Sequence, residues 1–442
     1  METAVADSTV KAIPMRPTTW SWARKGALAI ADQGVITASN FLVALMLARQ
    51  VSSAEYGAYA VAFEVFLLLA AVYLAFILEP ISIFGASTYK DCLPDYLGKM
   101  LTIQIWVTIT TVILVGGAAL GVYFAHASET LASALAAVAI AAPCVLLFWI
   151  ARRAFYINLA PGAALVGALL YSFILLTGLW VASSTHLLSP WFVFALMSVG
   201  ALTTGLVLLR KLRPTLGEAL ASPSVGEVCR QHWNYGRWAL ASAGASWAMS
   251  AVFYFALSGF HGLAASGEMK ALVNLSAPAA QGFTAVSLLS LPYASRIYDT
   301  QSATDIRRLS SRLTALYAGG TAAYFALVIG FGPSLLHLLY KGKYLNVAGL
   351  IPWLGLAMVL RIGATAQALL LRAVQSPSLV FVAYGASTLV AVFVGIPATK
   401  LFGLQGAIVT TVAVGATALS VSLLLLRSRL RAIEPRGELQ AA

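Results

Sequence analysis

The chain has 442 residues, of which 60% are hydrophobic and 10% charged, and its mean hydropathy is +0.85. An ordinary soluble domain is roughly 25% charged, so this composition excludes a soluble globular protein. The 28 Lys and Arg against 16 Asp and Glu give a net charge of +12. In a soluble protein this charge would suggest nucleic-acid binding, but here no nucleic-acid partner is expected, and the charge bears instead on membrane topology.

Long apolar runs follow one another along the whole chain. A helix needs about 20 apolar residues to cross a hydrocarbon core roughly 30 Å thick, and we count twelve such runs. The runs are 27–49, 55–78, 98–124, 131–151, 163–182, 190–210, 235–257, 270–292, 313–335, 350–373, 378–398 and 404–426. Transmembrane β-barrels are excluded because their strands are short alternating segments. The sequence therefore predicts an all-α integral membrane protein with about 12 transmembrane helices.

The longest stretch outside these runs, 211–234, lies after the sixth run and divides the chain into two sets of six helices. This division predicts an N-lobe at 27–210 and a C-lobe at 235–426, joined by a cytoplasmic connector. The remaining residues, 1–26 and 427–442, are predicted to form cytoplasmic tails. About 24 residues cannot bury a core of their own, so no extramembrane domain is expected to carry an active site.

Basic residues are distributed unevenly between the two sides of the predicted membrane. When the loops are assigned alternately, 22 Lys and Arg fall on the side of the termini. The other side has five, which are Arg49, Lys270, Lys341, Lys343 and Lys400. Positive charge is retained on the cytoplasmic side. Both termini are therefore predicted to be cytoplasmic, which requires an even number of spans.

Motifs for metal, cofactor or nucleotide binding are missing from the sequence. The three cysteines do not have the spacing of metal ligands, and no phosphate-binding loop of the GxxxxGK type occurs. We therefore expect no metal site, no cofactor and no enzymatic activity, and an ATP-driven pump would need a separate subunit.

Polar side chains inside the runs indicate where a cavity lies, because such groups usually face the bundle interior. Those at helical spacing are Gln33, Thr37 and Asn40 in the first run, and Lys270, Asn274, Pro278 and Gln281 in the eighth. In the seventh run, Ser242, Ser246 and Ser250 follow at steps of four. Small residues in this pattern are more typical of helix packing than of a ligand site.

Some charged residues lie within the runs, and two of them lie deep. Arg361 lies about 16 Å into its run and Glu64 about 13 Å into its run. An ionisable group at such depth costs roughly 3 kcal/mol or more, which makes it a candidate functional residue. The two residues could instead form a structural pair. Asp32 and Arg237 are nearer the cytoplasmic face, where they are either interfacial or functional.

Several stretches resemble one known family. ADQGVITASNFLVALMLARQVSSAEYGAYAVAF resembles the first two helices of bacterial polysaccharide flippases, the oligosaccharidyl-lipid exporters of the multidrug/oligosaccharidyl-lipid/polysaccharide superfamily. MKALVNLSAPAAQGFTAVSLLSLPYASRIY looks like their eighth helix, and LLYKGKY and FGLQGAIVTTVAV look like their late segments. The resemblance covers the whole chain in length and helix count. These motifs recur in exporters of many glycans, so they indicate the family better than the glycan.

The resemblance implies two six-helix lobes around a cavity that opens alternately to each side, similar to multidrug and toxin extrusion transporters. The implied cargo is an oligosaccharide on an undecaprenyl pyrophosphate carrier, moved to the periplasmic leaflet of the bacterial inner membrane for O-antigen, capsule or exopolysaccharide synthesis. The predicted substrate-cavity residues are Arg361, Arg237, Arg49, Lys270, Asn274, Asn40 and Gln33. Glu64 and Asp32 are predicted to couple transport to H⁺ or Na⁺, although membrane potential alone could also drive export. The protein is predicted to act as a monomer.

Two alternatives remain. A drug exporter of the same superfamily would share the fold, but its cavity would favour cations through acidic residues, whereas these spans hold more basic candidates. A membrane glycan polymerase or ligase usually has a large outer loop with catalytic Arg or His. No predicted outer loop is that long, and the four histidines near outer span ends, His126, His186, His261 and His337, have no spacing that relates them.

Overall fold

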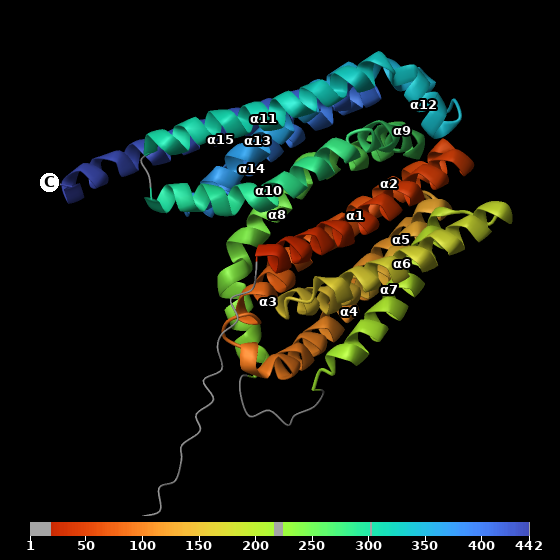
Figure 1. Ribbon diagram of the computed structural model, residues 1–442. Coiled ribbons are helices and arrows are strands. Elements are labelled where there is room, and N and C mark those ends of the chain that lie inside the picture. Colours follow the sequence, from red (N-terminus) through yellow and green to blue (C-terminus); the bar gives the residue numbers. More distant parts are fainter. Residues whose placement is uncertain (1–18, 216–223, 301–302, 442) are drawn as a thin grey trace, which may run out of the picture.

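The computed structural model describes residues 19–215, 224–300 and 303–441, and within them every regular element is helical (Figure 1). The N-terminal half contains α1 (Thr19–Gln50), α2 (Ser53–Tyr73), the π-helical turn η1 (Leu74–Leu78), α3 (Glu79–Phe84), the 3₁₀ turn η2 (Lys90–Cys92), α4 (Leu93–Phe124), α5 (Glu129–Ile157), α6 (Pro161–Ser184) and α7 (Pro190–Leu212). Several helices begin where the sequence provides a cap. Ser128 and Ser189 each accept a hydrogen bond from the backbone N–H three residues on.

The C-terminal half is also helical, but its helices are more often interrupted. It contains α8 (Val225–His261), α9 (Leu263–Asn274), α10 (Ala277–Thr300), α11 (Ala303–Gly330), α12 (Gly332–Tyr340), the 3₁₀ turn η3 (Leu345–Leu350), α13 (Ile351–Ala373), α14 (Pro377–Val390), the π-helical turn η4 (Ala391–Gly395) and α15 (Ile396–Ala441). Within α15 the backbone of Gly403 is non-helical, with φ 57° and ψ −137°. Because α14 and α15 pack against each other, Gly403 marks the point where the chain turns back.

Ten stretches of the described chain are long and apolar enough to cross a membrane. The last of them, Pro377–Ala432, has 56 residues and reverses at Gly403, so it provides two crossings. The predicted eighth run is occupied by α9 and α10, which are separate helices and are not among the ten. The reversal at Gly403 adds one crossing to the ten, and the α9–α10 pair adds another, which gives the twelve that the sequence predicts. The chain is a multi-pass membrane protein.

The helices form two lobes that meet at one end and separate towards the other (Figure 1). The N-lobe, α1 to α7, is held by a core in which α5 packs against α4 and α7. In the C-lobe, α13 packs against α11 and α15. The lobes contact each other where α2 packs on α9 and where α1 approaches α12. The C-terminal end of α15, the start of α11 and the start of α1 all lie at the separated end.

The helices extend further than the predicted boundaries of the tails and connector. Helix α1 begins at Thr19 and α15 continues to Ala441, so parts of both predicted tails are helical. Residues 1–18 and 442 of those tails lie outside the described part of the chain. Apolar runs underestimate helix length because Arg, Leu, Ala and Glu all favour helix in polar surroundings too.

The predicted connector is also partly helical, since α8 begins at Val225, while 216–223 lie outside the described residues. The first turns of α8 pack on the N-lobe. There the Nδ1–H of buried His232 donates to the carbonyl oxygen of Phe76 at 2.9 Å, and its Nε2 accepts from the Tyr96 hydroxyl at 2.7 Å. The Phe76 carbonyl lies in the π-helical turn η1. A π-helical turn interrupts the regular α-helical hydrogen bonds, so a carbonyl there can accept from a side chain instead. The connector is therefore docked on the N-lobe.

Candidate functional site: a charged cavity between the lobes

A cavity of about 460 Å³ lies between the lobes, and its wall contains three ionisable side chains. Glu64 comes from α2 of the N-lobe, whereas Lys270 comes from α9 and Arg361 from α13. Helix α8 adds Ser246, Trp247, Ser250 and Tyr254 to the wall. The sequence correctly placed a cavity between the halves, but most of its wall belongs to the C-lobe.

Glu64 occupies a position about three turns into α2. The start of this helix is fixed by a capping box, in which Ser52 and Glu55 bond reciprocally to each other's backbone N–H. The Glu64 side chain is buried, and its backbone oxygen accepts a hydrogen bond of 2.8 Å from the Trp247 indole. Among the described residues no hydrogen bond or ion pair reaches its carboxylate, which therefore faces the cavity without a direct partner.

Lys270 is also buried, and its ammonium contacts aromatic rings rather than a carboxylate. Its Nζ lies 4.5 Å from the ring centre of Phe63 and 5.9 Å from that of Tyr254. Cation–π contacts of this kind partly offset the desolvation of a buried ammonium without neutralising it. No carboxylate pairs directly with Lys270 among the described residues, so its side chain is available to a ligand in the cavity.

Arg361 lines both this cavity and a neighbouring space of about 320 Å³ beside the break between α9 and α10. At the break, Leu275 N–H and Ser276 N–H each bond to the carbonyl three residues earlier, and the Leu275 carbonyl accepts from the Tyr324 hydroxyl at 2.7 Å. Satisfying these groups allows a helix to be broken inside a membrane protein. The predicted continuous span at 270–292 is therefore wrong, and the break makes room next to Arg361.

The structural pair considered for Glu64 and Arg361 is not formed. Both residues line one cavity, yet no ion pair joins them in the part of the chain that the structure describes. With Lys270, the wall has two formal positive charges and one negative charge. A low-dielectric cavity with this balance favours an anion over a cation.

A second groove, of about 370 Å³, lies between α1 of the N-lobe and α10 of the C-lobe. Most of its lining is apolar, including Phe41 and Pro278, but Gln33 and Gln281 face it from opposite lobes. The predicted stripe in the eighth run is thus divided by the helix break. Lys270 lies in the charged cavity, whereas Pro278 and Gln281 lie in the side groove.

The end where the lobes meet is held by two reciprocal contacts, which we call the clamp. Arg49, at the end of α1, donates from Nε to the Leu339 carbonyl at 2.6 Å and from Nη2 to the Leu338 carbonyl at 2.7 Å, both at the end of α12. Lys343 in turn donates to the carbonyls of Arg49 at 3.1 Å and Val51 at 2.8 Å. The last carbonyls of a helix lack partners and carry partial negative charge. Each lobe therefore supplies a cation to a helix end of the other.

Close backbone contact supports the clamp. A Cβ at Gly57 of α2 would lie 1.6 Å from the Leu263 carbonyl oxygen, and one at Gly267 of α9 would lie 2.4 Å from the Ser53 oxygen. Only glycine allows the two helices to approach this closely. Beside them, Asn274 donates to the Tyr56 hydroxyl at 2.7 Å. Partial burial lowers the pKa of the Lys343 ammonium, and nearby Glu55 acts in the opposite direction.

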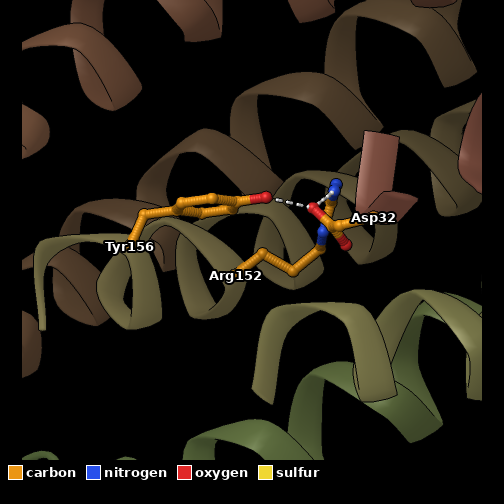
Figure 2. Close-up of polar contacts among 3 residues, drawn as sticks. All are labelled: Asp32, Arg152 and Tyr156. Atoms are coloured by element: carbon orange, nitrogen blue, oxygen red, sulfur yellow. Dashed lines mark hydrogen bonds and ion pairs between the residues drawn. The ribbon is translucent and has the colours of Figure 1, made fainter. Parts of the chain in front are cut away.

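Asp32 lies inside the N-lobe, where it is fully buried (Figure 2). Its Oδ2 forms an ion pair with Arg152 of α5 and accepts a hydrogen bond from the Tyr156 hydroxyl (Figure 2). Among the described residues, neither its other oxygen, Oδ1, nor Nε of Arg152 has a hydrogen-bond partner. Asp32 is therefore a buried and paired carboxylate, not one exposed at the protein surface. Its predicted role in ion coupling stays a prediction, now for a carboxylate that already has a cationic partner.

We expect Asp32→Asn to reduce the amount of folded protein in the membrane, because Arg152 would remain buried without its counter-charge. Removing one partner of a buried pair costs about 3–5 kcal/mol. The double variant Asp32→Asn/Arg152→Met should recover abundance, and Asp91→Asn, at an exposed carboxylate, should not change it. Quantitative immunoblotting of membranes gives the measurement. Normal abundance of Asp32→Asn together with lost transport would favour the coupling role instead.

The predicted cavity residues are thus distributed over several places. Lys270 and Arg361 line the charged cavity with Glu64, and Gln33 faces the side groove. Arg49 belongs to the clamp and Asn274 lies close to it. Neither Arg237, which is exposed on α8, nor Asn40 of α1 lines either space.

Sequence analysis missed Lys343, Arg152 and Tyr156 as site or pairing residues. In the sequence, Lys343 and Arg152 were counted only among the basic residues of the predicted loops. No local pattern distinguishes them from other basic residues at helix ends. Trp247 and Tyr254 were also missed because aromatic residues are common in membrane spans.

Comparison with known proteins supports the fold. No protein-family model and no curated protein sequence matches the chain. An inward-facing multidrug resistance MATE transporter of the MOP superfamily superimposes with a TM-score of 0.74 at 13% identity, over 92% of this chain and 99% of that one. An outward-facing MATE transporter gives a TM-score of 0.68 at 13% identity, over 94% and 96%.

A third solved structure with this fold is described by the polarity of its binding pocket. It is a MOP superfamily transporter from Pyrococcus furiosus, described by the reverse polarity of its binding pocket, with a TM-score of 0.66 at 14% identity over 94% and 96% of the two chains. Identities this low concern the fold alone. The predicted fold class, helical and similar to multidrug and toxin extrusion transporters, is confirmed.

Proposed function

We propose that this chain is an alternating-access transporter that exports an anionic amphiphile, specifically an oligosaccharide carried on a pyrophosphate lipid. The observation that carries the proposal is the charge of the interlobe cavity, where Lys270 and Arg361 face the single carboxylate of Glu64. A pyrophosphate is a strong hydrogen-bond acceptor with negative charge, and a guanidinium can bind it in bidentate fashion. The flippase interpretation of the sequence therefore depends on the charge of the cavity, since the solved structures with this fold support the alternative, a multidrug antiporter, at least as well.

The side groove supports the lipid part of the proposed cargo. It is bordered by one helix from each lobe, and its lining is mostly apolar with two amide side chains. While the polar head group of such a lipid is inside the cavity, its tail must stay in the bilayer. This requires an apolar path between the cavity and the bilayer. Helices α1 and α10 offer such a path at the boundary between the lobes.

The lobe arrangement supports an inward-open state of this transporter. The clamp closes the end that has five basic residues by sequence, and the lobes separate at the end that has 22 (Figure 1). By the distribution of positive charge, the separated end is cytoplasmic. The chain also superimposes better on the inward-facing than on the outward-facing MATE structure. The cargo would thus enter from the cytoplasmic leaflet and leave once the clamp opens.

A cation antiporter of the MATE type is the second candidate. The Glu64 carboxylate faces the cavity and has no direct partner within the described part of the chain, and Trp247 and Tyr254 lie in the same wall. A carboxylate next to aromatic rings is suited to an organic cation. The solved structures with this fold include multidrug resistance transporters. For this chain, however, a cationic drug would have to enter a cavity that contains Lys270 and Arg361.

Reconstitution of the full chain in liposomes tests the two candidates directly. We expect a fluorescent pyrophosphate-linked lipid disaccharide to change leaflets at least tenfold faster with protein than without it. A fluorescent organic cation should not accumulate, and a lipid disaccharide without the pyrophosphate should move slowly. Accumulation of the cation without movement of the pyrophosphate lipid would instead favour the antiporter. Equal movement of both lipids would contradict the role of cavity charge.

A further inference from the structure

A groove of about 710 Å³ lies on the C-lobe between α11 and α15, away from the charged cavity. Both helices pack mainly on α13 and only lightly on each other, which leaves a furrow along their line of contact. Its lining residues come from the N-terminal part of α11 and the C-terminal part of α15, and the start of α11 and the C-terminal end of α15 lie at the separated end of the molecule (Figure 1). Neither the cavity nor the side groove shares a residue with it.

The lining of this groove changes from basic to apolar along both helices. Arg307 lies near the start of α11, and Ala318 lies about 16 Å further into the same helix. On α15, which runs in the opposite direction, Leu423 is the deep residue, while Arg427 and Arg431 are at the end near the headgroups. Both walls therefore have their basic residues towards the same end of the groove, where Leu426 and Leu430 lie beside the arginines of α15, whereas the deeper end has no basic residue among those that line it.

The base of the groove is rigidly built at the level between the two zones. Gln367 of α13 is fully buried, accepts a hydrogen bond of 2.9 Å from Ser310 and donates to Thr314. The Thr314 hydroxyl donates to the Ser310 carbonyl at 2.8 Å. These contacts hold α11 at a fixed rotation on α13, so Arg307 faces the same groove as the arginines of α15.

We propose that this groove binds an anionic phospholipid from the membrane leaflet on the side of the chain termini. The phosphate would lie among the arginines, and an acyl chain would lie along Ala315, Ala318 and Leu423. Guanidinium groups from two helices can bind phosphate oxygens through charge-assisted hydrogen bonds. Basic pockets between transmembrane helices on the cytoplasmic side bind anionic headgroups. The small alanines leave space for a chain where larger residues would fill the furrow. The bound lipid joins α11 to the end of α15 and is independent of the exported cargo.

The test compares the removal of two arginines that line the groove with the removal of one arginine outside it, and with a variant that keeps every charge. Arg427→Gln/Arg431→Gln removes two arginines that line it, whereas Arg429→Gln removes an exposed arginine of the same helical turn that does not. A third variant, Ala318→Leu, fills the apolar end and keeps every charge. The full chain is studied in nanodiscs of phosphatidylcholine with rising fractions of phosphatidylglycerol. Thermal unfolding and native mass spectrometry of retained lipid are the measurements.

We expect phosphatidylglycerol to raise the melting temperature of the wild type and of Arg429→Gln. Its apparent affinity should fall about 30-fold in the double arginine variant and clearly in Ala318→Leu, while melting without anionic lipid stays unchanged. Equal losses in Arg429→Gln and the double variant would overturn the proposal in favour of diffuse charge attraction. A full response to inorganic phosphate alone would overturn it in favour of a soluble anion site. If a variant already melts at a lower temperature without anionic lipid, the variants are compared by the amount of phosphatidylglycerol that they retain. The wild type and Arg429→Gln must then retain more than Ala318→Leu and the double arginine variant.

Discussion

Arg361→Ala is expected to slow export of the pyrophosphate-linked lipid by about 10- to 100-fold, the range that corresponds to losing one hydrogen-bonded charged group. Arg361 lines the interlobe cavity, and no carboxylate pairs with it directly among the described residues. Arg361→Lys should retain part of the rate because it keeps the charge and loses the bidentate geometry. The rate is measured in liposomes, and surface glycan is measured in cells.

The matched control is Arg372→Ala, at an exposed arginine in the last turn of the same helix. It should leave both the export rate and protein abundance close to normal. The double variant Glu64→Gln/Arg361→Ala distinguishes a ligand role from a structural pair. If export is restored by the double variant, the two side chains act as a pair, and the proposed role of Arg361 in binding cargo is wrong.

Opening of the clamp is expected to have the second large effect, on conformation. Arg49→Ala/Lys343→Ala removes four hydrogen bonds from charged groups to carbonyls that join the lobes. A hydrogen bond to a charged group contributes about 1.5–3 kcal/mol. Even with partial compensation by water, the equilibrium should shift by about 100-fold towards opening at this end. Export should slow as well, because the state that accepts cargo becomes less populated.

Distances between spin labels at exposed Leu187 in the N-lobe and exposed Leu338 in the C-lobe measure this opening; the Leu338 carbonyl belongs to the clamp, but its side chain does not. The three native cysteines, Cys92, Cys144 and Cys229, are first replaced by serine. Lys341→Ala is the control, since Lys341 is an exposed basic residue two positions from Lys343 that makes no interlobe hydrogen bond among the described residues. An unchanged distance distribution in the double variant would contradict this prediction and show that the other interlobe contacts, such as the one at Gly57 and Gly267, are sufficient to hold this end closed.

The sequence by itself determined the helices, their number and the most deeply buried charges. Each apolar run specifies a helix locally, because a chain in lipid must satisfy its own backbone hydrogen bonds. A single charge in such a run is equally visible, which is why Glu64 and Arg361 could be identified from position alone. The uneven basic residues also gave the expected side of the termini.

Only the tertiary structure decided which of these groups meet. Asp32 pairs with Arg152 across 120 residues of sequence, and Lys343 caps a helix end 292 residues away. The break after Asn274 likewise interrupts an apolar run that reads as continuous in the sequence. Sequence patterns report the neighbours of a residue along one helix, whereas pairing, gating and cavity lining depend on which faces of different helices pack together. In a membrane, a helix face that packs against another helix and a face that contacts lipid are similarly apolar, so the sequence rarely distinguishes the two.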